Sequence, residues 1–150
     1  MDKGVAGDLY VLLADDDADD RMFFQDAIEE IELKINLVTV KDGQELMSFL
    51  ERDAIMIPQV LFLDLNMPFK NGLQCLQEIR SNGNFNDICI ILYSTTARQS
   101  DIDQGFDHGA NFFVHKPSSF TDLKRILTAI FTIDLKSCQK PEKDSFFFKV

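Results

Sequence analysis

The sequence lacks any apolar run long enough to span a membrane, and its start shows no signal-peptide pattern. We therefore expect a soluble cytoplasmic protein with no membrane partner. Basic residues are also scarce, with 15 Lys and Arg against 25 Asp and Glu, which gives a formal net charge of −10. No stripe of Lys and Arg offsets this negative charge, so the sequence argues against a nucleic-acid partner.

Tryptophan is absent and cysteine is rare. Cys75, Cys89 and Cys138 are odd in number and widely spaced, so they indicate neither a disulfide framework nor a metal site. Cys75 and Cys89 fall in an expected helix and an expected strand, and we interpret both as small core residues. In contrast, 45% of the 150 residues are apolar and 14 are Phe. That composition excludes a disordered chain and suffices for the core of one domain.

Apolar runs of strand length alternate with stretches of helical periodicity along the chain. The expected strands are Leu9–Ala14, Ile35–Val40, Gln59–Leu63, Ile88–Tyr93 and Asn111–His115. The expected helices begin after Asp17, after Asp42, at Gly72, at Arg98 and after Ser118 or Ser119. This alternation predicts an α/β fold: one doubly wound, five-stranded parallel sheet with helices on both faces, a (βα)5 arrangement. In the flavodoxin-like order 2-1-3-4-5, the first and third strands lie side by side at a ligand-binding crevice.

The two ends of the chain differ in composition from its middle. Residues 1–7 are polar and are expected to be flexible, residues 8–135 to form the domain, and residues 136–150 to form a disordered tail. Deleting residues 137–150 is then expected to leave the melting temperature almost unchanged. The alternative is that Phe146–Phe148 dock on a partner or on the domain itself, since three adjacent Phe are costly to leave in water.

Acidic, hydroxyl and basic side chains come directly after four of the expected strands. Asp15 and Asp16 follow the first, Asp64 the third, Ser94 the fourth, and Lys116 the fifth. These positions converge at the carboxyl edge of a parallel sheet. Clustered carboxylates need a hard cation, and Mg²⁺ fits because it takes one or two carboxylates together with a phosphate. The lysine and the hydroxyl suit a phosphoryl group.

Each of these side chains has an assigned role. Asp64 is the expected nucleophile, since a carboxylate can attack phosphorus and form an acyl phosphate. Asp15, Asp16, Asp64 and the backbone carbonyl of Asn66 are the expected Mg²⁺ ligands. The Lys116-Pro117 bond is a candidate cis peptide that would fix the direction of the lysine. Asp17, in contrast, reads as a helix cap, and Asp19 and Asp20 as acids that favour the helix dipole.

Taken together, these segments resemble the receiver domains of two-component signalling, especially the stand-alone, chemotaxis-regulator-like response regulators. The acceptor motif of that family, D-x-x-M-P-x-x-x-G, matches Asp64 through Gly72 at every fixed letter. Its acidic pair, its Ser/Thr, its Lys-Pro and its aromatic switch position match Asp15-Asp16, Ser94, Lys116-Pro117 and Phe113. The resemblance covers about residues 8–135. Ser94 stands where Thr is commoner and Phe113 where Tyr is common, and the family tunes its phosphoryl lifetime at the positions of Asn66 and Thr96.

The resemblance implies a single-domain response regulator that accepts a phosphoryl group on Asp64 from a histidine kinase or phosphotransfer protein, with Mg²⁺ as cofactor. It implies catalysis of the protein's own phosphorylation and dephosphorylation rather than turnover of a substrate. It also implies that Phe113 moves with Ser94 and alters the fourth helix, fifth strand and fifth helix. The output is then an interaction with an unknown target, or a phosphorylation-dependent homodimer.

Three alternatives remain at this stage. A Mg²⁺-dependent phosphohydrolase also uses an aspartyl nucleophile, but it usually needs a second acid where this chain has Asn66. A flavin-binding domain would need neutral donors where Asp15–Asp17 stand. A phosphorylation-independent adaptor would have no use for the complete set of acceptor-site residues.

Overall fold

The computed structural model describes residues 9–52, 57–133 and 142–148. Its strands are β1 (Leu9–Ala14), β2 (Ile35–Val40), β3 (Val60–Leu63), β4 (Cys89–Ser94) and β5 (Phe112–His115). Its helices are α1 (Ala18–Glu30), α2 (Gly43–Arg52), α3 (Gly72–Arg80), α4 (Gln99–Asp107), α5 (Phe120–Phe131) and α6 (Lys143–Phe146), with a 3-10 turn at Gly83–Phe85. No helix in these ranges is both long and apolar enough to cross a membrane.

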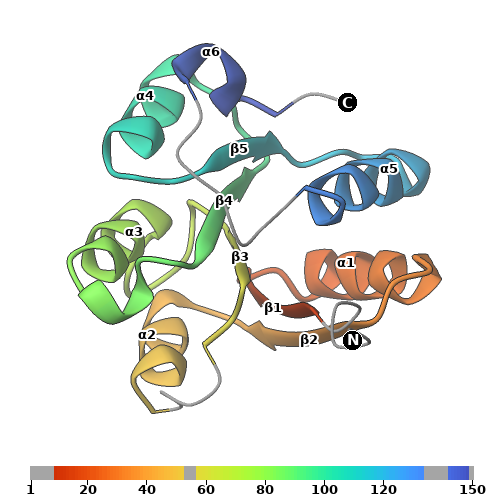
Figure 1. The fold of residues 1–150 in the computed structure, drawn as a ribbon, viewed down its shortest axis with the longest axis horizontal. Helices are drawn as coiled ribbons and strands as arrows, with labels where there is room; N and C mark the ends of the chain where they lie inside the picture. The colour runs from red at the N-terminus through yellow and green to blue at the C-terminus, as the bar shows by residue number, and fades with distance from the viewer. Residues whose placement is uncertain (1–8, 53–56, 134–141, 149–150) are drawn as a thin grey trace.

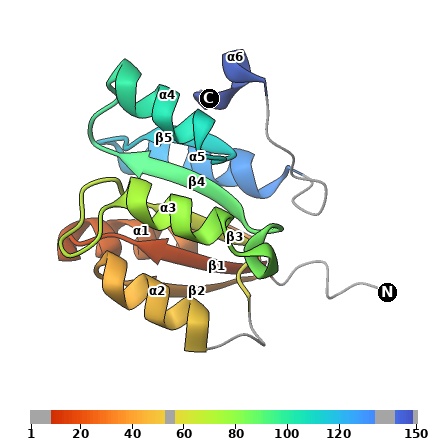
Figure 2. The same cartoon turned by 90° about the vertical axis from the view of Figure 1, so that its left-hand side faces the viewer.

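The strands form one parallel sheet in the order β2-β1-β3-β4-β5. Helices α1 and α5 cover one face, and α2, α3 and α4 cover the other (Figure 1). The turned view of Figure 2 shows the same layers with the strands running side by side between them. The predicted fold and strand order are confirmed.

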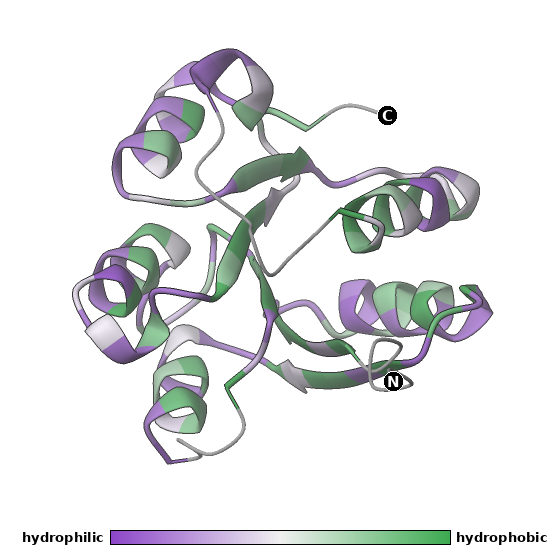
Figure 3. Cartoon of the chain, viewed as in Figure 1, coloured by the Kyte–Doolittle hydropathy of each residue, from purple (hydrophilic) through white to green (hydrophobic). Residues whose placement is uncertain are grey.

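Strand side chains alternate between two cores, because successive residues of a strand point to opposite faces. Val11 and Leu13 of β1 pack toward α1 and α5, whereas Leu12 and Ala14 pack toward α2 and α3. Figure 3 shows the apolar strands at the centre and polar residues on the outer sides of the helices. Continuous apolar runs such as Leu9–Ala14 are therefore buried on both faces, as parallel strands require.

Local signals set where two of the helices begin. Asp17 caps α1, and its side chain accepts hydrogen bonds from the backbone N–H groups of Asp19 and Asp20, at 2.8 and 3.2 Å. Asn71 caps α3 in a capping box with Gln74. Because Asp17 already satisfies the first turn of α1, the neighbouring Asp15 and Asp16 are available for another role.

The C-terminal segment corrects one prediction. Residues 142–148 pack on the domain, with Phe146 fully buried, and Phe147 forms a parallel bridge with Phe113 of β5. The expectation of a disordered tail is therefore wrong for these residues, because aromatic burial outweighs the polar composition around them. The docking alternative holds for this part of the tail. Residues 1–8 and 134–141 lie outside the described ranges.

Candidate functional site

The side chains predicted for the site meet at the carboxyl edge of the sheet. Asp15 follows β1, Asp64 follows β3, Ser94 ends β4 and Lys116 follows β5. Asp15 and Ser94 are fully buried, and Asp64 is 5% exposed. Buried polar groups are costly unless they have partners, so the partners of these side chains decide what the site can do.

Lys116 is the centre of the site. Its Nζ lies 2.8 Å from Oδ2 of Asp15, 2.9 Å from Oδ2 of Asp20 and 3.2 Å from Oδ2 of Asp64. Its backbone N–H donates to the carbonyl of Ser94 at 2.7 Å, and its ammonium lies 5.3 Å from the ring centroid of Tyr93. The side chain is only 8% exposed. One cation thus faces three carboxylates inside the protein.

Three carboxylates of the site are placed to share a metal ion. One ligand oxygen from each of Asp15, Asp16 and Asp64 lies within 4.8 Å of the others. Oδ2 of Asp15 is buried and, although it contacts Lys116, it has no partner with hydrogen-bond geometry among the described residues. Carboxylate oxygens grouped in this way are the ligands that a hard cation such as Mg²⁺ prefers. The donor set therefore fits the predicted metal.

The surroundings of Asp64 disfavour its ionised form. Burial raises the pKa of Asp64 to about 6, with Lys116 opposing the increase and Asp15 adding to it. Burial works against the charge of Lys116, but its contacts with Asp15, Asp64 and Asp20 raise its pKa overall. The lysine therefore stays protonated, and a second cation is needed to offset the remaining negative charge of the carboxylates.

The chain around Asp64 is shaped by Gly72 and by a turn. The backbone N–H of Asn66 donates to Oδ1 of Asp64 at 3.2 Å, and that of Gly72 donates to the carbonyl of Leu65 at 2.9 Å. A Cβ on Gly72 would lie 2.3 Å from the carbonyl oxygen of Asp64. The glycine of the predicted motif is therefore required because the start of α3 approaches the acceptor strand too closely for any side chain.

Ser94 has the expected place but another partner. Its Oγ accepts a hydrogen bond from the backbone N–H of Thr96 at 3.1 Å and lies 3.3 Å from the Thr96 hydroxyl. The hydroxyl is held within its own loop as an acceptor from the Thr96 N–H, and its O–H remains a donor that can turn toward another group.

The predicted cis peptide before Pro117 is wrong. No cis peptide bond occurs among the described residues. An X-Pro bond prefers the trans form by about 0.5–1 kcal/mol, and only a structural need overrides that preference. Here the bond from the Lys116 N–H to Ser94 and the three carboxylates already direct the lysine.

The sequence did not predict the contacts that three residues make in the site. Asp20 contacts Lys116, although its place in a run of acids suggested only a helix-dipole effect. Arg21 donates to the backbone carbonyl of Asp15 at 2.8 Å, and His115 bonds the carbonyl of Thr95 at 2.9 Å. Because α1 begins only at Ala18, no helical spacing connects the acidic pair to Asp20 and Arg21, and the sequence pattern gave no signal for these contacts.

Phe113, the predicted switch residue, is fully buried in β5. Its ring lies 6.5 Å from that of Phe146 and 5.9 Å from that of Phe147, centroid to centroid. The strand that leads to Lys116 thus also carries the contact with the C-terminal segment.

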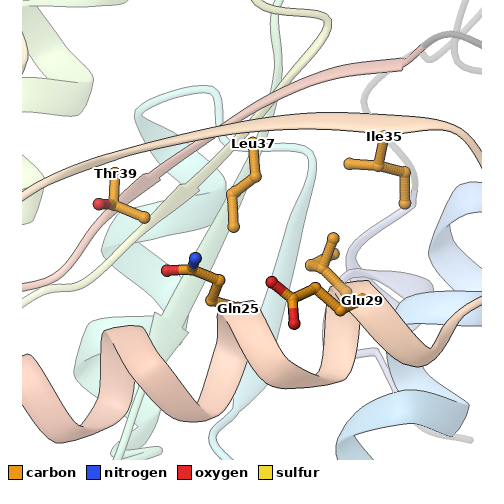
Figure 4. A pocket seen from close by; sticks show the side chains of 6 residues that line it. Gln25, Glu29, Ile35, Leu37 and Thr39 are labelled. Carbon is orange, nitrogen blue, oxygen red and sulfur yellow. The ribbon is translucent and has the colours of Figure 1, made fainter.

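A separate hollow lies between α1 and β2. Ile35 and Leu37 of β2 point toward Gln25 and Glu29 of α1, with Thr39 at one end (Figure 4). Its lining has no cationic side chain and no cluster of carboxylates, so it lacks the chemistry of the carboxyl edge.

Comparisons with known proteins agree with this geometry. Residues 11–128 match the family described as response regulator receiver domain. The response regulator Rcp1 of Synechocystis sp. is 24% identical over 135 residues, which are 87% of this chain and 92% of Rcp1.

Two solved structures share the fold. The Mn²⁺-bound form of Rcp1 superposes with a TM-score of 0.76 at 24% identity and covers 89% of this chain and 99% of that one. The phosphorylated cyanobacterial phytochrome response regulator RcpA gives a TM-score of 0.78 at 28% identity, with the same coverage.

Proposed function

Because this chain belongs to the response regulator receiver family, we propose that it accepts a phosphoryl group on Asp64 from a histidine kinase or phosphotransfer protein. The family acts in two-component signalling. The observation that carries the assignment to Asp64 is the buried carboxylate itself, which lies 3.2 Å from Lys116 and close to the carboxylates of Asp15 and Asp16.

The proposed reaction is a displacement at phosphorus. An Oδ atom of Asp64 attacks, the bond from phosphorus to the donor breaks, and the donor leaves with the electron pair. The product is an acyl phosphate with about −1.5 to −2 charges, by analogy with other phosphorylated side chains. Lys116 is placed to hold a phosphoryl oxygen, since its ammonium already faces Oδ2 of Asp64.

The proposed cofactor is Mg²⁺, held by Asp15, Asp16, Asp64 and the carbonyl of Asn66. Bound there, it would neutralise the charge of an incoming phosphoryl group. The grouping of one oxygen each from Asp15, Asp16 and Asp64 within 4.8 Å supports this role. The fold neighbour Rcp1 was crystallised with Mn²⁺.

Signal output is proposed to follow from Ser94. Its hydroxyl turns toward the phosphoryl group, and Phe113 then repacks, which alters the surface of α4, β5 and α5. Either a second copy or another protein reads that surface, in the cytoplasm. No turnover of a substrate is assigned, and nucleic acid is not an expected partner.

The phosphohydrolase alternative is weakened by residue 66. Asn66 is exposed, and its N–H bonds Asp64, so no second carboxylate stands two positions after the acceptor to act as acid or base.

The deciding experiment is incubation with acetyl phosphate and Mg²⁺, followed by intact mass measurement. We expect a gain of one phosphoryl group in the wild type and in Asp87→Asn, a control at an exposed acid. Asp64→Asn should gain none. An equal gain in Asp64→Asn would refute the acceptor assignment, and steady release of phosphate from a phosphomonoester would favour the hydrolase.

A further inference from the structure

The C-terminal segment Glu142–Phe148 occupies the outer edge of the sheet. The backbone N–H of Phe148 donates to the carbonyl of Phe113 at 2.9 Å, and Phe147 bridges to Phe113 in parallel orientation. Figures 1 and 2 place α6 beside α4 and next to β5. An edge strand offers unpaired N–H and C=O groups to any extended segment, and here the chain supplies its own.

The three Phe side chains of the segment pack against β5 on both faces of the sheet. Phe146 is fully buried on the α4 side, where its ring packs edge-on against Phe106 with a centroid distance of 5.4 Å. Phe148 packs against Phe112 at 5.5 Å, on the side of the α1–α5 core. Phe146, at the end of α6, and Phe147 therefore lie on the α4 side of β5, and Phe148 lies on the other side.

Charge and space on α4 complement this segment. Lys143 forms a salt bridge with Asp103 at 3.2 Å, and its ammonium lies 6.0 Å from the Phe106 ring. Gly105 lets α4 lie close to β4, since a Cβ there would be 2.4 Å from Cδ1 of Leu92, and the Phe146 ring packs beside it, 3.5 Å from the same Cβ position. Backbone pairing, an aromatic pocket and a charge pair together make a docking surface rather than an accidental contact.

The docking surface is joined to the acidic site by a single short strand. Phe113 contacts both Phe146 and Phe147, and Lys116 follows three residues later. In the register of β4 with β5, Leu92 faces Phe113 and Ser94 faces His115. Any displacement of Ser94 or Lys116 is therefore passed to the strand on which the segment is docked.

We propose that the surface formed by α4 and β5 is a docking surface for a short, Phe-rich segment that ends in an extended residue pair, occupied in the resting protein by residues 143–148 of the same chain. We further propose that this docking is weakened when Asp64 carries a phosphoryl group. The second statement rests on the proposed function, whereas the first does not. The surface freed in this way accepts a partner segment of the same chemistry.

The first test measures docking in the full-length chain. Amide hydrogen exchange of Phe148 should be about 100-fold slower than in a free peptide, because burial of a Phe side chain holds the segment in place. Lys143→Asp should speed this exchange a few-fold, and adding Asp103→Lys should restore it, since the charge pair is then rebuilt with reversed sign. Exchange at the free-peptide rate in the wild type would overturn the docking surface.

A second test asks whether the docking surface accepts a segment in trans. A fluorescent peptide of residues 142–148 should bind the full-length Phe146→Ala variant at least about tenfold more tightly than the wild type, whose tethered segment competes at high effective concentration. Phe69→Ala, which truncates an 80%-exposed Phe, should behave as the wild type. Equal binding to all three proteins would contradict a specific docking surface.

The third test measures linkage with Mg²⁺ and beryllofluoride, a phosphoryl mimic whose binding is followed by fluorine NMR. Phe148 exchange should become about tenfold faster on binding in the wild type and stay constant in Asp64→Asn. Bound mimic with unchanged Phe148 exchange would overturn the linkage and leave the docking surface in place. Failure of the mimic to bind the wild type would count against the proposed function and the linkage together, with docking decided by the first two tests.

Discussion

Strand β5 carries two clusters of opposite character. At its carboxyl end, Lys116 lies among three carboxylates, with little access to water. Along its outer edge, Phe112 and Phe113 pack against the rings of Phe146, Phe147 and Phe148. The acidic cluster and the aromatic cluster are only a few residues apart, yet the buried Asp64 of the first and the packed rings of the second act on the free energy of unfolding in opposite directions.

Within the acidic cluster, the buried carboxylate of Asp64 costs stability, whereas the raised pKa of Lys116 works in the opposite direction. Burial raises the pKa of Asp64 to about 6, so its ionised form is disfavoured by the fold at neutral pH. The aromatic cluster provides stability, since burying one Phe side chain contributes about 1.5–3 kcal/mol and each edge-to-face ring pair adds about 0.5–1.5 kcal/mol. The fold thus holds a reactive carboxylate in an energetically unfavourable, buried position. Apolar packing along the outer edge of β5 stabilises the strand that leads to the same site.

The largest effect should come from removing the acceptor. Asp64→Asn should reduce phosphorylation by acetyl phosphate to background, because an amide oxygen is a far weaker nucleophile than a carboxylate. Phe146→Ala, in the aromatic cluster, should be phosphorylated at close to the wild-type rate. The two rates are compared by intact mass over time, and a loss in both variants would show that the clusters are not separable.

The same substitution should change stability with a particular dependence on pH. The folded-state pKa of Asp64 is raised from 3.8 to about 6, so its stabilising contribution is present below pH 3.8 and is lost as the pH rises through 6. The advantage of Asp64→Asn over the wild type should therefore grow across this window to at most about 3 kcal/mol, at about 1.4 kcal/mol per pKa unit. Urea unfolding of both proteins without Mg²⁺ at pH 4, 5, 6 and 7 measures the difference, in which carboxylates distant from Asp64 cancel. A constant or shrinking difference would contradict the assigned cost.

The acidic cluster was largely predictable from the sequence, and the aromatic cluster was not. Asp15, Asp64 and Lys116 follow continuous apolar runs, and in a parallel sheet all such runs end at one edge. Phe146–Phe148 have neither helical nor strand periodicity, and their partners on α4 and β5 are distant in the sequence. Only the cost of exposing three Phe suggested that the segment docks, and that cost does not identify a docking site.

Within the acidic cluster, the sequence did not predict which of several similar Asp residues makes which contact. Asp17, Asp19 and Asp20 are alike in the sequence, but Asp17 caps the helix and Asp20 reaches Lys116. The trans form of Pro117 likewise depends on contacts that fix Lys116 from elsewhere. Strand ends are set by local pattern, whereas these choices are set by tertiary packing.

Truncating Phe146 should weaken the aromatic cluster specifically. Phe146→Ala should lower the free energy of unfolding of the C-terminal segment by about 1.5–3 kcal/mol, the value of one buried Phe side chain. The matched control Phe69→Ala, at an 80%-exposed position, should change it by less than about 0.5 kcal/mol. Limited proteolysis of the segment together with thermal melting measures both. Equal effects at the two positions would mean that the segment contributes nothing.

Mg²⁺ should stabilise the protein by binding the acidic cluster, and this stabilisation should not depend on the aromatic cluster. At ten times its dissociation constant, a metal that binds only the folded state stabilises it by about 1.4 kcal/mol. Melting curves should therefore shift upward in the wild type and in Phe146→Ala. The shift should be smaller in Asp16→Ala, because this substitution removes a candidate metal ligand. Since Asp16 is exposed, the substitution does not disturb the core. An undiminished shift in Asp16→Ala would place the metal elsewhere.

The smallest expected effect concerns Asp20, which the sequence had assigned only to the helix dipole. Its Oδ2 lies 2.9 Å from Nζ of Lys116, and it therefore competes with any phosphoryl oxygen for one N–H donor of the ammonium. Asp20→Asn should accelerate phosphorylation by acetyl phosphate about two- to fivefold, since a partly exposed ion pair is worth roughly 0.2–1 kcal/mol. Asp19→Asn removes the same charge at an exposed position one residue earlier, and separates the contact with Lys116 from the general change in net charge. If both variants accelerate the reaction equally, Asp20 acts through net charge alone. If only Asp20→Asn does, and Asp20→Glu restores the wild-type rate, the carboxylate belongs to the acidic cluster as a positioning residue for Lys116.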